Sequence, residues 1–86
     1  MMYPYMKLMD GTEVVHSHIL EDNHVKVHFE HPTEDGFDSA TCMLPEYEWK
    51  RIEGYSEKEI EFFNEYLIHN VHLLYRYAAN GGLKFT

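Results

Sequence analysis

Apolar and polar side chains alternate with a period of two along much of residues 3–44, which is the pattern of half-buried β-strands. Turn-forming residues interrupt this alternation at Asp10 and Gly11, at residues 21–23, and in the polar segment 31–36. We therefore predict four strands joined in chain order, at about residues 3–9, 13–20, 24–30 and 37–44.

The period changes to that of a helix after residue 56. Ser56 followed by Glu59 is a capping box, and residues 80–82 contain helix-ending glycines, so we predict a long helix over about 57–79. Pro45 suits the first turn of a short helix over about 45–52. The predicted fold is α+β: a four-stranded antiparallel β-meander with a short helix and one long C-terminal helix packed on one face. Residues 1–86 form a single domain.

Hairpin geometry assigns each strand residue to one face of the sheet. With Asp10 and Gly11 as a two-residue loop, Tyr5 pairs with His16, and with residues 21–23 as the next loop, Val15 pairs with Phe29. The predicted core face then carries Met6, Leu8, Val15, Ile19, Val25, Val27, Phe29, Ala40, Cys42 and Leu44. The opposite face receives four of the five histidines of residues 14–31.

These histidines are the main candidate for chemistry. In this register His16 lies directly opposite His28, and Cβ atoms at opposed positions are about 5 Å apart, close enough for two imidazoles to share one zinc ion. The predicted ligands are His16, His28 and His18, with Glu30 as an alternative third ligand. Two other interpretations remain open: a solvated sheet face on which histidine has no special role, and a pH-sensitive surface of clustered imidazoles.

The long helix carries two apolar stripes. One is predicted to face the sheet: Ile60, Phe63, Leu67, Val71, Leu74 and Ala78. The second is predicted to be an interface: Phe62, Tyr66, Leu73 and Tyr77. Because a sheet covers one stripe, we expect the second to form a homodimer, with a contribution from the outer sheet face. The alternative is that the predicted helix over 45–52 covers it.

Charge and composition restrict the partners. Fifteen acidic residues against seven basic ones give a net charge of −8, which opposes direct binding to nucleic acid or to an anionic membrane. A basic protein partner suits this charge. The chain has one cysteine, no apolar run of membrane-spanning length and no signal-peptide pattern near its start, so we expect a cytoplasmic protein.

Two functions follow. The first is a small acidic interaction or regulatory module, non-catalytic and dimeric, such as an inhibitor or adaptor that binds a basic protein. The alternative is a zinc-type sensor or hydrolase that uses the histidine-rich face. We predict no catalytic residues and no cofactor apart from zinc in that alternative. Cys42 is expected to be buried on the face opposite the histidines, which disfavours a Cys–His nucleophile pair.

Overall fold

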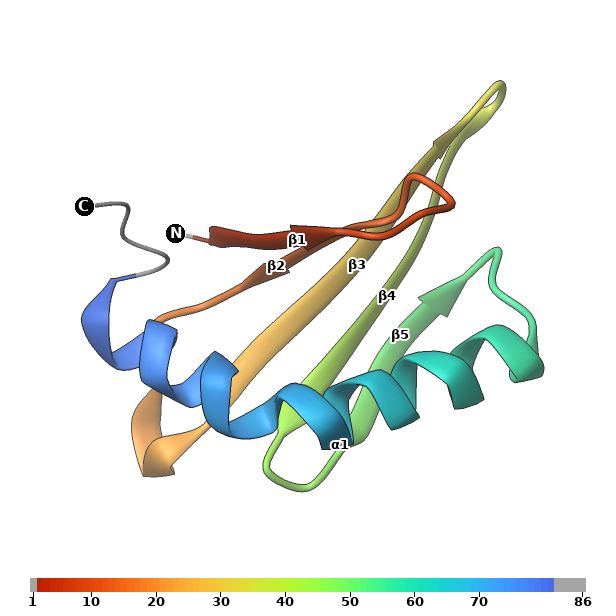
Figure 1. The fold of residues 1–86 in the computed structure, drawn as a ribbon. Helices are drawn as coiled ribbons and strands as arrows, with labels where there is room; N and C mark the ends of the chain where they lie inside the picture. Colours follow the sequence, from red (N-terminus) through yellow and green to blue (C-terminus); the bar gives the residue numbers. More distant parts are fainter. Residues whose placement is uncertain (1, 82–86) are drawn as a thin grey trace.

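A computed structural model describes residues 2–81 of the chain as an antiparallel sheet crossed by a long helix (Figure 1). The strands, each hydrogen-bonded to the next, are β1 (Tyr3–Lys7), β2 (Glu13–His16), β3 (Val25–Thr33), β4 (Gly36–Leu44) and β5 (Glu48–Glu53). The helix α1 (Glu57–Asn80) follows them, and a 3-10 turn (Glu21–Asn23) precedes β3. The α+β class, the antiparallel meander and the long helix are confirmed, but the sheet has a fifth strand.

The prediction of a helix over 45–52 is wrong, because β5 occupies most of this range. Tyr47 has a left-handed φ of 58°, which ends a turn over residues 45–47 and directs the chain back along β4. A bulge near Lys50 adds one residue to β5, so Trp49 and Ile52 both face the helix side although they are three positions apart. The prediction of a helix relied on Pro45, which lies instead in the turn before β5.

The β3–β4 hairpin has the predicted faces and a different register. Alternation favoured a pairing of Val27 with Ala40, but Val27 pairs with Cys42 and Phe29 with Ala40, a shift of two positions. The shift keeps every side chain on its predicted face because the side-chain period is two. It also reduces the expected long loop to a tight turn at residues 34–35, and the hairpin extends beyond α1 (Figure 1).

The predicted register of β2 against β3 is wrong by one residue. Leu20 N–H donates to the His24 carbonyl as expected, but Ser17 N–H donates to the Lys26 carbonyl (2.9 Å). Between these two hydrogen bonds, residues 18–19 lie across from Val25 alone. The Ser17 hydroxyl accepts the Lys26 N–H at 2.9 Å and stabilises this irregularity. Every side chain of β2 therefore points to the face of the sheet opposite to the predicted one.

A second irregularity lies in β1. The register shifts between Pro4 and Met6, so that Tyr5 is an extra residue whose side chain is buried on the helix side. The loop is also longer than predicted, because Leu8 rather than Met9 pairs with Thr12. Together these changes bring Val14 and His16 into the core in place of Val15, and leave Met6 about half exposed.

The ends of α1 follow local signals, as predicted. The Ser56 hydroxyl accepts the Glu59 N–H, the Glu59 carboxylate accepts the Ser56 N–H, and Gly81 closes the helix in the left-handed conformation. No helix within residues 2–81 is long and apolar enough to span a membrane.

The core lies between α1 and the sheet. Phe29 stacks on Phe63 with ring centroids 4.4 Å apart, and Tyr55 meets the edge of Phe63 at 4.9 Å. The predicted core stripe of α1 is confirmed: Phe63, Leu67, Leu74 and Ala78 are buried, and Ile60 and Val71 are half-buried. The other face of the sheet, which we call the outer face, is not covered by any element of the described residues.

Candidate functional site

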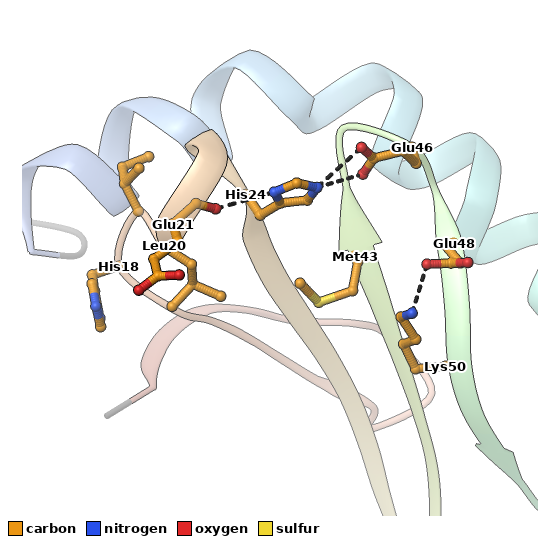
Figure 2. A pocket seen from close by; sticks show the side chains of 9 residues that line it. His18, Leu20, Glu21, His24, Met43, Glu46, Glu48 and Lys50 are labelled. Carbon is orange, nitrogen blue, oxygen red and sulfur yellow. Dashed lines mark hydrogen bonds and ion pairs between the residues drawn. The ribbon is translucent and has the colours of Figure 1, made fainter.

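A hollow opens at one end of the sheet. It has a volume of about 1080 Å³ and lies between residues 18–24 and the β4–β5 connection (Figure 2). Its lining combines apolar and charged side chains: His18, Ile19, Leu20, Glu21, His24, Met43, Glu46, Glu48 and Lys50.

One wall of the hollow is the 3-10 turn and its flanks. Asp22 and Asn23 both have left-handed φ values, of 59° and 61°, which short side chains with local hydrogen-bonding groups tolerate best. The Tyr75 hydroxyl donates to the Asn23 carbonyl at 2.8 Å, so α1 fixes the position of the turn. This wall therefore has a defined shape, although it is made of loop residues.

The opposite wall is joined to the first by an ion pair. His24 Nε2 lies 2.9–3.0 Å from the two carboxylate oxygens of Glu46, and His24 Nδ1 lies 3.1 Å from the Glu21 carbonyl (Figure 2). Both ring nitrogens face acceptors, so both must donate and the ring is an imidazolium in this geometry. The Glu21 carbonyl and then Glu46 raise the pKa of His24. A hydrogen bond from its own backbone N–H, followed by those to His24, lowers the pKa of Glu46.

The hollow has an acidic rim and an apolar floor. Glu21, Glu46 and Glu48 are exposed around it, whereas Lys50 is the one lysine in the lining and pairs with Glu48 at 2.7 Å (Figure 2). Ile19, Leu20 and Met43 are half-buried beneath. This arrangement suits a side chain with an apolar stem and a cationic head, because lysine and arginine bury their methylenes and keep their charge at a surface.

A second concave surface lies between β5 and the first half of α1. It has a volume of about 730 Å³ and is lined by Trp49, Lys58, Ile60, Glu61, Phe62, Asn64 and Glu65. Two carboxylates oppose one lysine here, and the lining is more apolar. With His24 charged, the linings of the two surfaces therefore carry the same net charge, and the hollow of Figure 2 differs in having three carboxylates instead of two and a less apolar lining.

The predicted zinc ligands are not brought together. His16 pairs with Val27 on the helix side and is completely buried, whereas His28 pairs with Val15 and Thr41 on the outer face. The prediction that His16 and His28 are exposed cross-strand neighbours is wrong, because the inverted register of β2 separates them. His18 is exposed in the hollow. Among residues 2–81, no group of three His, Cys, Asp or Glu side chains is placed to hold a metal ion.

Each of the two histidines has its own local partners. His16 Nδ1 donates to the Ser17 carbonyl at 2.8 Å, and the ring lies against Tyr3 and Tyr5, with centroids 5.7 and 6.3 Å away. Its Nε2 has no hydrogen-bond partner among the described residues. His28 Nδ1 is 2.9 Å from the Thr41 hydroxyl.

The predicted interface residues of α1 do not form one exposed stripe. Tyr66 and Tyr77 pack against Tyr5 of β1, with ring centroids 6.4 and 5.9 Å away, and burial raises the pKa of Tyr66. Leu73 is half-buried, and Phe62 is 61% exposed. The bulged Tyr5 thus covers surface that was expected to need either a partner or residues 45–52.

Cys42 is completely buried on the helix side, as predicted. Burial raises the pKa of its thiol to about 12, so the group is protonated at neutral pH. His16 also faces the helix side, contrary to the predicted separation of cysteine and histidines.

No protein-family model, curated protein or solved structure matches the chain. Sequence reasoning missed the hollow because one of its walls, with Glu46, Glu48 and Lys50, was assigned to a helix. The turn-forming residues around His24 were visible in the sequence. Their meeting with residues 46–50 depends on β5.

Proposed function

We propose that this protein is a small, non-catalytic binding module that takes a basic segment of another protein into the hollow of Figure 2. The observation that supports the proposal most is the acidic rim above an apolar floor, on a chain whose net charge is −8. In this role it acts as an inhibitor or adaptor that covers a cationic surface of its partner.

The charges of the rim explain how such a segment would bind. Glu21 and Glu48 are on opposite walls, so two cationic side chains of one segment can each meet one of these carboxylates. The side chain that reaches Glu48 competes with Lys50 for it, and Glu46 becomes a third acceptor when it is released from His24. The half-buried Met43 and Leu20 provide apolar contact for the stems of these side chains.

The test uses a synthetic peptide with arginines flanking leucine, and a matched peptide with glutamates in place of the arginines. Isothermal titration calorimetry should detect the first peptide only. The double variant Glu21→Gln, Glu48→Gln should weaken binding about tenfold, because both carboxylates lose their charge. The control variant Glu61→Gln, Glu65→Gln makes the same change in net charge on α1.

Equal weakening in the two variants would show that only the overall charge attracts the peptide, and would overturn the assignment to the hollow. Greater weakening in the α1 variant would move the site to the groove beside β5. Chemical-shift changes at the backbone amides of His24 and Lys50, recorded on the same samples, locate the bound peptide directly.

A further inference from the structure

The ion pair of His24 with Glu46 occupies one of the acceptors that line the hollow of Figure 2. His24 Nε2 faces both carboxylate oxygens of Glu46, and His24 Nδ1 faces the Glu21 carbonyl (Figure 2). His24 and Glu46 both belong to the lining. A cationic side chain that enters the hollow therefore competes with the imidazolium of His24 for the Glu46 carboxylate.

The net charge of the lining depends on the protonation of His24. The three glutamates of the lining contribute three negative charges, and Lys50 contributes one positive charge. With His24 charged, the lining carries −1, the same as the groove beside β5, and with His24 neutral it carries −2. Loss of this proton therefore makes the hollow the more acidic of the two surfaces. His18 lines the same hollow but is in none of the ion pairs found among residues 2–81.

The backbone on both sides of the pair is held independently of it. Strand β3 begins one residue after His24, and β4 ends two residues before Glu46. From α1, the Tyr75 hydroxyl donates to the Asn23 carbonyl at 2.8 Å. Burial and then the charge of Glu46 raise the pKa of Tyr75, so this neighbour stays neutral. Deprotonation of His24 therefore releases the Glu46 side chain and leaves both walls in place.

Charged groups around the pair set the pH at which it opens. The Glu21 carbonyl, then the Glu46 carboxylate and the charge of Asp22, raise the pKa of His24 above 6.5. The pKa of Glu46 is lowered by a hydrogen bond from its own backbone N–H, then by His24 and by Lys50. Glu46 is therefore ionised throughout the range in which His24 loses its proton, and the pair opens above pH 6.5.

We propose that His24 regulates the site for the basic segment: its imidazolium holds Glu46, and loss of its proton releases this carboxylate to the bound segment. This inference rests on the proposed function. Because the proton and the segment exclude each other at Glu46, their binding is linked. The segment binds more weakly in acid, and its binding releases a proton from His24.

The test measures the affinity of the peptide with arginines flanking leucine, its ends blocked, by isothermal titration calorimetry at about pH 5.5 and about pH 8. The wild type should bind about fivefold more tightly at the higher pH, because a further carboxylate is available. At about pH 7, the heat of binding should differ between phosphate and Tris in the sense of proton release, because the two buffers differ in ionisation enthalpy. Equal affinities at the two pH values, or equal heats in the two buffers, would overturn the proposal.

Two variants separate the release of Glu46 from a general effect of charge. His24→Gln leaves Glu46 free at every pH, so at about pH 5.5 it should bind nearly as tightly as the wild type does at about pH 8. Glu46→Gln removes the acceptor, so it should bind weakly at both. A wild-type pH dependence that persists in His24→Gln would assign the effect to another group, such as His18, and overturn the proposal.

His69→Gln is the matched control. His69 Nε2 lies 3.9 Å from Glu65 on α1, an ion pair of the same kind, and His69 does not line the hollow. This variant should keep the pH dependence of the wild type, and its loss here would contradict the assignment to His24. If the peptide binds at neither pH, the proposed function fails and this inference with it. If it binds equally at both, the proposed function stands and only the regulation fails.

Discussion

The two faces of the sheet share one backbone and differ in almost every other respect. Cys42 on the helix side is fully buried, whereas its neighbour Thr41 on the outer face is partly exposed and contacts His28. The helix side contains the aromatic core, and the outer face contains paired charges and one exposed phenylalanine. The difference teaches that one residue of register decides whether a side chain of this sheet enters the core or faces solvent.

The largest expected difference between the faces is in thiol reactivity. At the same pH, a pKa of about 12 instead of 9.0 lowers the thiolate fraction of Cys42 about a thousandfold, and burial blocks the reagent as well. A Thr41→Cys, Cys42→Ala variant should therefore react with a thiol reagent at least about a thousandfold faster than the wild type. The measurement is the absorbance of the released chromophore. Similar rates would show that Cys42 is accessible.

Neighbouring residues of α1 allow the same comparison in free energy of unfolding. Leu67→Ala should lower it by about 2–5 kcal/mol, because the side chain is completely buried against the sheet. Ile68→Ala, at a position that is 46% exposed, should cost about 1 kcal/mol or less. Urea denaturation followed by circular dichroism measures both. Equal costs would contradict the orientation of the helix.

The two histidines once predicted to be neighbours should behave differently. His16→Ala should cost about 2 kcal/mol or more, since it removes a fully buried ring packed on Tyr3 and Tyr5. His28→Ala should cost about 1 kcal/mol or less, because this ring is partly solvated on the outer face. If urea denaturation gave the larger cost for His28, the register of β2 would need to be reversed.

The smallest effect is a pH dependence at the rim of the hollow. The pKa of His24 is raised above 6.5, so its pair with Glu46 stabilises the fold below pH 6.5 and this contribution disappears as pH rises through the raised value. The pKa of Glu46 is lowered below 4.5, so the contribution also disappears as pH falls through that value.

The wild type should therefore exceed His24→Gln in melting temperature most clearly between about pH 4.5 and 6.5, with the difference shrinking above that window. Lys26→Gln, a charge change on the outer face away from this pair, serves as the control and should show no such window. A difference that grew toward high pH would contradict the raised pKa of His24.

Local interactions allowed α1 to be predicted from the sequence to within a residue or two. The Ser56–Glu59 box and the glycine after Asn80 act within one turn, so their effect does not depend on the rest of the fold. The sequence also predicted which side chains of β3 and β4 face the core. In these strands the alternation is unbroken, so all of the apolar positions fall on one face, and that face must be the buried one. These two parts include most of the core.

Only the tertiary structure decided the register of β1 and β2, the existence of β5, and with them the candidate site. Each depends on an added residue, at Tyr5, at residues 18–19 or near Lys50, and such an addition leaves no signal in an alternating pattern. The packing of Tyr5 against Tyr66 and Tyr77 favours its bulge, and the packing of Trp49 on Phe29 favours the bulge in β5. These contacts join residues more than sixty positions apart for Tyr5 and twenty apart for Trp49, so the sequence alone could not reveal them.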